Sequence, residues 1–400
     1  MRKKIVMSVA MGAIWFLTAC GDDLSITVPA TAESLPIYTD EQTEDGEMSG
    51  VETENNETQE ESSEAQEELR SEGSTEPEES TEPEEVTITI SAAGDTSLGN
   101  YYGQGYSLSF RETWEKEQDA SYFLENVYDI FSNDDMTIVN LEGSFTNAQE
   151  RNKEQEFCIS GDPEFVEILT VGSVEAVTMA NNHRTDFFDQ GTADTVETLE
   201  NAGIPYAYSQ YTGVYETKGI RIGFVAVNEV RQPGTEVEKY LQEGIDKLKE
   251  EEADLILACC HWGIERDYYP NDYQQELGKK CIDWGADLVL GHHPHVVQGI
   301  EEYKGKYIVY SLGNFCFGAN RNPKDKDCFI YQQTFTFLDG ELQADSSARI
   351  IPCSVSSVSN RNDYKPTPAE GDEAQRILDK MNECSIQFHV QFDEEGNIIR

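Results

Sequence analysis

The chain has 400 residues and a formal net charge of −48 at pH 7, which is distributed unevenly along its length. Residues 21–85 contain 23 Asp and Glu residues and one basic residue, Arg70, while residues 86–400 carry a net charge of −29. Such an acidic surface repels nucleic-acid phosphates, so we expect no nucleic-acid partner. It also disfavours anionic substrates unless a bound metal supplies local positive charge.

The first twenty residues have the pattern of an export signal. Residues 2–4 are Arg-Lys-Lys, and the apolar run 5–17 is too short for a stable membrane span. The run ends in Leu17-Thr18-Ala19-Cys20, which resembles a bacterial lipobox; an ordinary secretory peptide cut nearby is the alternative. We expect residues 1–20 to be a lipoprotein signal peptide with a lipidated Cys20, which would anchor the protein to the outer face of the cell membrane.

Residues 21–85 are predicted to form a disordered acidic linker. They contain few apolar residues and include a tandem repeat of Ser-Thr-Glu-Pro-Glu-Glu at 74–79 and 80–85. The segment has too little apolar surface to offset the chain entropy that ordering would cost. Because its charges repel one another, we expect it to hold the folded part away from the membrane or wall.

Segments with the patterns of strands and helices alternate from Val86 onward. The expected strands are 86–93, 136–139, 176–179, 220–227, 254–259, 286–290 and 307–311. The expected helices are 119–132, 163–171, 189–202, 236–252 and 272–284. This alternation predicts an α/β fold in which helices cover the faces of a sheet.

The pattern weakens after Phe337. A strand at 349–352, a helix at 369–382 and a last strand at 386–392 are expected there. We therefore predict one domain over residues 86–345, followed by a closing segment, 346–400, that packs on it.

Polar side chains able to bind metals follow five of the expected strands. They are Asp95, Glu142, the pair Asn182-His183, His261 and the stretch His293-Pro294-His295. A single residue of this kind after a strand is usually a helix cap or a turn residue. Because ligands bind at the carboxyl ends of strands in α/β sheets, five together predict one rim of ligands. Carboxylate, amide oxygen and imidazole suit one or two divalent ions.

Six motifs in this region resemble those of one protein family. They are Gly94-Asp95-Thr96-Ser97-Leu98, Asn140-Leu141-Glu142, Asn181-Asn182-His183-Arg184-Thr185-Asp186, His261-Trp262-Gly263-Ile264-Glu265, residues 291–298 and Tyr310-Ser311-Leu312-Gly313-Asn314-Phe315. Together they resemble the CapA family of poly-γ-glutamate capsule synthesis proteins, within the calcineurin-like metallophosphoesterase superfamily. The resemblance covers residues 86–317 well and weakens toward residue 390. It implies a four-layer α/β/β/α sandwich with metals at the strand ends.

The resemblance implies a role for each of these polar residues. Asp95, Asn182, His261, His293 and His295 match metal ligands, Glu142 stands where a bridging aspartate is usual, and His183 matches the catalytic histidine. The implied cofactor is one or two divalent ions of Mn, Zn or Fe. Ser97 occupies a place where the superfamily usually has a histidine, so one metal site is short of a ligand. Phe188 stands where the family pattern has a glycine.

Other polar residues near these motifs are candidates for orienting the ligands. Asp186 and Glu265 lie within a few residues of expected ligands, although each could equally be a solvated loop acid. Asn314 is a third candidate, and His292 is expected to pack or support the site, with an extra ligand as the alternative. The eight cysteines beyond Cys20 are compatible with disulfides or with buried thiols.

Three functions are compatible with these residues. The first is a lipid-anchored, metal-dependent CapA-like protein in the synthesis, export or surface retention of an anionic polymer such as poly-γ-glutamate, working with membrane components of a capsule machinery. The second is a metal-dependent hydrolase of phosphoesters or wall-derived amides. The third is a polymer-binding scaffold without catalysis. Ser97 weakens the case for a dinuclear hydrolase, and the ligand set at the strand ends weakens the case for a scaffold.

Overall fold

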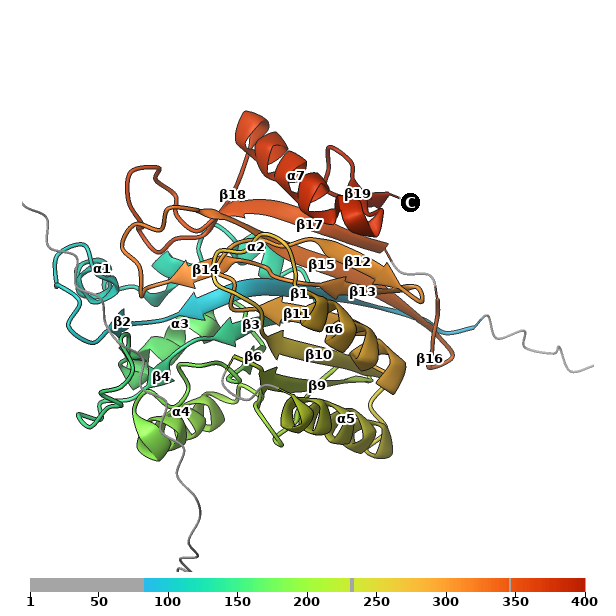
Figure 1. Cartoon of the computed structure of the whole chain (residues 1–400), viewed down its shortest axis with the longest axis horizontal. Helices are drawn as coiled ribbons and strands as arrows, with labels where there is room; N and C mark the ends of the chain where they lie inside the picture. Colours follow the sequence, from blue (N-terminus) through green and yellow to red (C-terminus); the bar gives the residue numbers. More distant parts are fainter. Residues whose placement is uncertain (1–82, 231–233, 345–346, 400) are drawn as a thin grey trace, which may run out of the picture. The chain divides into compact units, whose positions relative to one another are not determined.

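The computed structural model describes residues 83–230, 234–344 and 347–399, which all lie in one of the chain's two units, Pro77–Arg400. Two large β-sheets pack face to face in this unit, with helices on their outer faces (Figure 1). The predicted mixed α/β class is therefore confirmed. The predicted signal peptide, Cys20 and all but the last three residues of the acidic linker lie outside the described residues.

The larger sheet has nine strands. Its order is β18-β17-β15-β1-β3-β6-β7, with β14 pairing β1 and β16 pairing β15. The strands are β1 (Glu85–Ser97), β3 (Met136–Leu141), β6 (Ala176–Thr178), β7 (Tyr206–Ala207), β14 (Asn314–Phe317), β15 (Asp327–Leu338), β16 (Glu341–Leu342), β17 (Ser347–Ser354) and β18 (Thr367–Pro368). β1, β3, β6 and β7 run parallel, whereas β15 pairs antiparallel with β1. β1 therefore lies in the interior of the sheet.

The smaller sheet has six strands in the order β12-β13-β11-β10-β9-β8. The strands are β8 (Gly213–Thr217), β9 (Ile220–Asn228), β10 (Leu255–His261), β11 (Leu288–His292), β12 (Ile300–Tyr303) and β13 (Lys306–Val309). The four inner strands run parallel, and the two edge strands pair antiparallel with their neighbours. The inner strands are almost continuously apolar, as expected for parallel strands that are covered on both faces.

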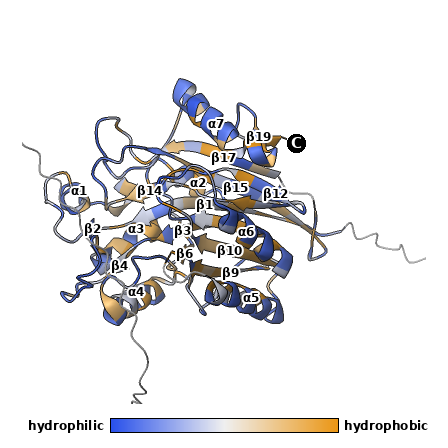
Figure 2. Ribbon diagram, in the orientation of Figure 1, coloured by the Kyte–Doolittle hydropathy of each residue, from blue (hydrophilic) through white to orange (hydrophobic). Residues whose placement is uncertain are grey.

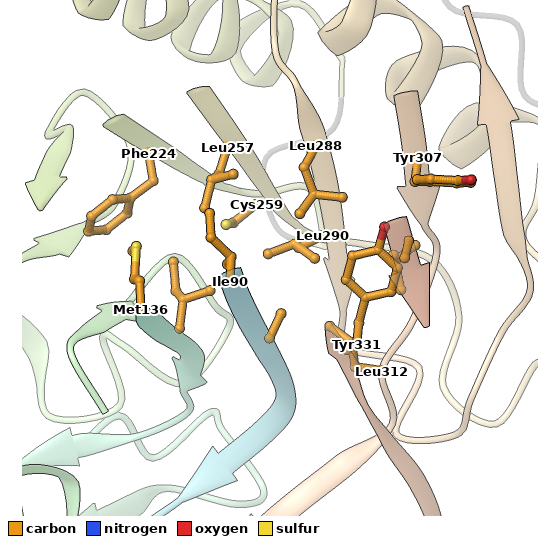
Figure 3. Close-up of a cluster of buried hydrophobic side chains, with 14 of the residues drawn as sticks. Ile90, Met136, Phe224, Leu257, Cys259, Leu288, Leu290, Tyr307, Leu312 and Tyr331 are labelled. Carbon is orange, nitrogen blue, oxygen red and sulfur yellow. The ribbon is translucent and has the colours of Figure 1, made fainter. Parts of the chain in front are cut away.

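The main hydrophobic core lies between the two sheets (Figure 3). Ile90 of β1 and Met136 of β3 face Leu257 of β10 and Leu288 of β11, and all four side chains are fully buried. Burial of one such side chain contributes about 1.5–3 kcal/mol. This core determines which side of β1 faces the smaller sheet, since side chains alternate along a strand.

Helices cover the outer faces of both sheets. On the larger sheet lie α2 (Tyr128–Phe131), α3 (Val166–Val171) and α4 (Phe188–Ala202), and on the smaller sheet lie α5 (Thr235–Glu250) and α6 (Asp272–Trp284). α7 (Gly371–Ser385) contacts β17 of one sheet and β12 of the other, along their shared edge. Figure 2 shows mixed polar and apolar faces on α5, α6 and α7, whereas β9 and β10 between the helices and the core are mainly apolar. No helix in the described part of the chain is long and apolar enough to cross a membrane.

The remaining elements are short. α1 (Phe110–Glu117) precedes the 3-10 helix η1 (Ala120–Phe123), and η2 (Pro163–Phe165) leads into α3. A small sheet, β2-β5-β4, consists of β2 (Asn100–Tyr101), β4 (Ser144–Phe145) and β5 (Ile159–Gly161). Near the end of the chain, η3 (Ile386–Phe388) is followed by the pair β19 (Gln391–Phe392) and β20 (Ile398–Ile399). The eight cysteines of the described residues are all buried, and no disulfide joins them.

Two expected elements differ in the structure. The single helix predicted over 119–132 is wrong, because η1 and α2 are separated by turns with i→i+3 bonds such as Val127 N–H to Leu124 O. The buried residues of this segment still recur with the spacing of a helix. The segment forms tighter turns because its aromatic and β-branched residues have low helix propensity. The last strand predicted over 386–392 is also wrong, since its first three residues form η3 and only Gln391 and Phe392 pair.

Candidate metal centre

The predicted ligands converge because the parallel strands of both sheets end at one rim. Glu142 directly follows β3, His261 is the last residue of β10, and His292 is the last residue of β11. Within each sheet the ends are in register, with Asp95 opposite Asn140 and His261 opposite His292. The carboxyl ends of strands from two sheets therefore contribute side chains to a single site.

A β-bulge turns Asp95 toward the smaller sheet. Ala93 pairs with Val139 and Asp95 pairs with Asn140, so Gly94 is an extra residue in β1. Regular alternation through Gly94 would direct Asp95 to the helix side, where Ala93 packs, and the bulge prevents this. A side chain does not fit at the bulge, because a Cβ on Gly94 would lie 2.0 Å from the carbonyl oxygen of Gly313.

Asp95, Glu142 and His295 form the acidic half of the site. One ligand atom from each lies within 4.8 Å of those of the other two. Nδ1 of His295 is 3.1 Å from Oδ2 of Asp95, and Nε2 of the same ring is 3.6 Å from Oε1 of Glu142. Both carboxylates are completely buried.

Burial and neighbouring charges act on these groups in different directions. Burial alone would raise the pKa of Asp95, but His292 and His295 beside it hold that pKa well below its usual range. Burial raises the pKa of Glu142 to about 7, and Asp95 adds to this rise against the effect of His295. Burial would lower the pKa of His295, yet the charges of Glu142 and Asp95 raise it to about 10.

The side chains of this half fit a divalent cation. Both carboxylate oxygens of Glu142 are buried and have no hydrogen-bond partner among the described residues. A buried carboxylate without partners is costly, so such groups normally pair with charges or coordinate metals. Two carboxylates and an imidazole form a ligand set that suits Mn, Fe or Zn.

The second half of the site consists of imidazole and amide groups. Nε2 of His261 lies 2.7 Å from Oδ1 of Asn182, and the rings of His261 and His293 have centroids 4.9 Å apart. Burial lowers the pKa of His261 well below its usual range, and burial lowers the pKa of His293 to about 4. Both rings are therefore neutral at pH 7, which is the form of histidine that binds metals.

His183 faces the acidic half from the other side of Glu142. Its Nδ1 lies 2.7 Å from Oδ2 of Asp186, and its Nε2 lies 3.7 Å from Oε1 of Glu142. The carboxylate of Asp186 also accepts a hydrogen bond from the backbone N–H of Ile159. An imidazole whose Nδ1–H donates to a carboxylate presents Nε2 to the opposite side, toward the acidic half.

Two other residues predicted to orient ligands occupy different environments. Oδ1 of Asn314 lies 3.0 Å from Nδ1 of His295, and its Nδ2 donates to the backbone oxygen of the same histidine. Glu265 is exposed, and no hydrogen bond joins it to a histidine in the described part of the chain. The structure therefore provides a contact for the role expected of Asn314 and none for that expected of Glu265.

Sequence reasoning assigned no role to Asn140, although this residue supports the centre. Its Nδ2 donates to Oδ1 of Asp95 and lies 3.4 Å from Nδ1 of His261, while its Oδ1 accepts from Nδ2 of Asn181. Its position at a strand end, two residues before Glu142, was the signal available. His292 is buried, with Nδ1 3.4 Å from Oδ1 of Asp95, and it supports the acidic half.

The loop that carries His293 and His295 is strained. These residues have φ angles of +96° and +57°, in the left-handed region that residues with a Cβ rarely adopt. Each such conformation costs on the order of 1–3 kcal/mol and persists only where surrounding contacts impose it. Here the backbone N–H of His293 donates to Oδ2 of Asp95, which holds the loop against the opposite sheet.

A pocket of about 470 Å³ opens beside the centre. His183 and His295 line it, together with the aromatic residues Tyr101, Phe157 and Phe317. Volumes of roughly 300–1,000 Å³ are typical of small-ligand sites. A substrate in this pocket would contact the face of the centre that carries the proposed catalytic histidine.

Comparisons with known proteins agree with the motifs. The model of the bacterial capsule synthesis protein PGA_cap family matches residues 89–319, more than half of the chain. The chain is 29% identical over 254 residues to the capsule biosynthesis protein CapA of Bacillus anthracis, covering 58% of this chain and 60% of that protein. It is also 29% identical over 249 residues to the PGA biosynthesis protein CapA of Bacillus subtilis (strain 168), covering 58% and 63%.

Solved structures show weaker similarity. A 5'-nucleotidase from Candida albicans has a TM-score of 0.38 and 11% identity, over 76% of this chain and 58% of that chain. The purple acid phosphatase PPD1 from yellow lupin has a TM-score of 0.34 and 11% identity, over 75% and 56%. At such scores these structures support no conclusion about this chain.

The family assignment therefore depends on the sequence match. The chain spans 60% and 63% of the length of the two CapA relatives, so the match concerns a common domain and not their whole length. This domain contains the strand ends described above and all six predicted metal ligands. The resemblance to CapA proteins is confirmed, and the chain belongs to the bacterial capsule synthesis protein PGA_cap family.

Proposed function

We propose that this protein acts in the synthesis, export or surface retention of a capsule polymer of the poly-γ-glutamate type, and that the action depends on a divalent metal. Asp95, Glu142 and His295 would hold one ion tightly. Asn182, His261 and His293 would hold a second ion, which we expect to bind more weakly because none of these three side chains is a carboxylate.

The observation that carries this proposal is the carboxylate of Glu142. It is completely buried beside a second buried carboxylate, and neither of its oxygens has a hydrogen-bond partner among the described residues. A merely structural role would favour an apolar or hydrogen-bonded side chain at this place, since burying a carboxylate costs several kcal/mol. A cation supplies the missing partner.

Elemental analysis of the purified full-length protein tests the metal centre. We expect about one equivalent of Mn, Fe or Zn in the wild type, and loss of this metal in the Glu142→Gln and His295→Ala variants. Glu276→Gln is the matched control, because Glu276 is exposed on α6 and forms an ion pair with Lys280 alone in the part of the chain that the structure describes. Absence of metal from the wild type after incubation with all three ions would contradict the proposal and leave a polymer-binding scaffold.

The pair His183 and Asp186 favours hydrolysis as a second candidate function. When bound, a divalent ion supplies positive charge that acidifies water and polarises a substrate oxygen. Nε2 of His183 faces the acidic half, and in the imidazolium form of the ring this nitrogen is positioned to give a proton to a leaving group. Release of product from a phosphoester or from a γ-glutamyl amide, lost in His183→Ala with metal content unchanged, would support this activity.

The cellular setting is part of the same proposal. The lipobox at Cys20 and the acidic linker up to residue 85 support an extracellular domain, 86–345, held to the cell membrane by lipid. The closing segment, 346–400, contributes β17 to the larger sheet, and membrane components of a capsule machinery are the expected partners. Labelling with palmitate, lost in Cys20→Ala, tests the anchor.

The order of layers supports assignment to the metallophosphatase type of fold. Helices, the larger sheet, the smaller sheet and a second set of helices follow one another, with the centre at the strand ends. An experimental structure with bound metal tests this assignment by the positions of the ligands around the ion.

A further inference from the structure

Two arginines line the pocket beside the metal centre without a carboxylate partner. Arg266 and Arg321 both line it, and neither forms an ion pair with an acidic residue in the described part of the chain. Arg111, Arg221 and Arg376 do form such pairs, and the other described arginines without one, Arg151, Arg184, Arg349 and Arg361, do not line this pocket. Guanidinium groups left without a partner at a pocket are available to an anionic ligand.

Arg266 is held by the loop that carries two of the proposed metal ligands. Its backbone N–H donates to the carbonyl oxygen of Pro294 at 2.7 Å, and its φ angle is +64°. A residue with a Cβ adopts this conformation at a cost, so the contact with the loop fixes it. The place at which the Arg266 side chain enters the pocket therefore depends on the 293–295 loop.

Arg321 also lines the pocket and is held by contacts with two other segments of the chain. Nη1 of its guanidinium donates to the carbonyl oxygen of Ser107 at 2.9 Å, while the remaining donors of the group form no described hydrogen bond. Its backbone oxygen accepts from the N–H of Asn362, whose side chain also donates to the backbone oxygens of Phe317 and Asn320. The closing segment thus supports this part of the pocket, which extends past the last residue of the family match, 319.

We infer that Arg266 and Arg321 form a carboxylate-binding subsite that orients an acidic acyl chain across the metal centre. This inference rests on the proposed function, and it adds the residues that would select the substrate. Arginine binds carboxylates through two parallel N–H donors, which fixes the orientation of the ligand as well as its charge. The aromatic residues Tyr101, Phe157 and Phe317 provide an apolar wall for the methylene groups of such a chain.

Glu265 allows a test in which substitutions should change the binding affinity in opposite directions. Among the described residues it is the one acidic side chain that lines the pocket, where it would repel the carboxylates that the two arginines attract. If these three residues had a purely structural role, substitution of each should weaken ligand binding by a similar small amount. A carboxylate subsite predicts opposite effects, because removing Glu265 strengthens binding while removing either arginine weakens it.

Calorimetric titration of a synthetic γ-linked tetraglutamate into the metal-loaded, full-length protein tests the subsite. We expect Arg266→Gln and Arg321→Gln each to weaken binding about tenfold or more, and Glu265→Gln to strengthen it about threefold. Arg221→Gln is the matched control, since Arg221 lies on β9 away from the pocket and should bind within twofold of the wild type. The neutral γ-linked tetraglutamine should bind weakly to every variant.

The possible failures are distinguishable. If the wild type binds tetraglutamate and both arginine variants bind equally well, the subsite is wrong while the proposed function stands. If the wild type holds no metal and binds no tetraglutamate, the proposed function itself fails. If inorganic phosphate binds with the same dependence on both arginines and tetraglutamate does not, the pocket selects phosphate and the inference is overturned.

Discussion

Nδ1 of His183 lies 2.7 Å from Oδ2 of Asp186, so the carboxylate determines which ring nitrogen carries the proton. We expect Asp186→Asn to leave a mixture of imidazole tautomers, because the amide can either donate or accept. Nitrogen chemical shifts of a His-labelled protein check this, with metal content measured alongside. If the assay for hydrolysis succeeds, turnover should fall about 10–100-fold in the same variant. An unchanged tautomer would contradict the orienting role.

Glu142→Gln should change the stability of the chelator-treated protein in a pH-dependent way. The pKa of Glu142 is raised to about 7, above the ordinary value of 4.5, so the folded state favours the protonated form. The carboxylate therefore reduces stability as pH rises from 4.5 through 7, by up to ~3 kcal/mol. Urea unfolding should show the variant stabilised at pH 8 and unchanged at pH 4. Glu276→Gln should show no such difference, and equal effects at both pH values would contradict the assignment.

Metal binding to the chelator-treated protein should strengthen as pH rises. The pKa of His295 is raised to about 10, so this ring is protonated at pH 7 and must lose its proton to become a ligand. The apparent affinity should rise about tenfold per pH unit between pH 7.5 and 9, with about one proton released per ion. Titration calorimetry in buffers of different ionisation enthalpy measures the released proton. A wild-type affinity independent of pH would exclude His295 as a ligand.

Phe188→Gly should stabilise the protein. Phe188 has a φ angle of +55°, and 44% of its surface is exposed, so its backbone is strained and little apolar contact is lost on substitution. Relief of the left-handed conformation should raise the free energy of unfolding by about 1–2 kcal/mol. The flexibility of glycine in the unfolded chain should lower it by about 0.5–1 kcal/mol. Thermal unfolding measures the difference. Phe188→Ala is the control, because it removes the ring and keeps the strain, and a glycine variant no more stable than this control would contradict the argument.

The convergence of the centre could be predicted from the sequence because strand ends are easy to recognise. Asp95, Glu142 and His261 each follow an apolar run, and parallel strands necessarily end on the same edge. The positive φ of Phe188 likewise agrees with the glycine expected there from the resemblance. In both cases a short stretch of sequence was enough to predict the local backbone geometry.

Other features depend on contacts between distant parts of the chain. Asn140 lies at a strand end near Glu142, but only its hydrogen bond to Asp95 shows that it supports the centre. Glu265 is close in sequence to His261, but the turn after β10 directs it to the surface. The strand β15 was not predicted, although it pairs with β1 from Glu85 to Ala92.

The position of β1 in the sheet has a consequence for how the chain reaches its native state. Thr87 pairs with Thr336, and the N–H of Asp95 donates to the carbonyl oxygen of Gly313, so the first strand completes its ladders only with residues from the last third of the chain. Contacts this distant in sequence slow folding, since a long loop must close first. A chain that stops before β15 would leave β1 with an open edge available to other chains. The chain must therefore be present through β15 before the centre can form, and truncated products are expected to aggregate.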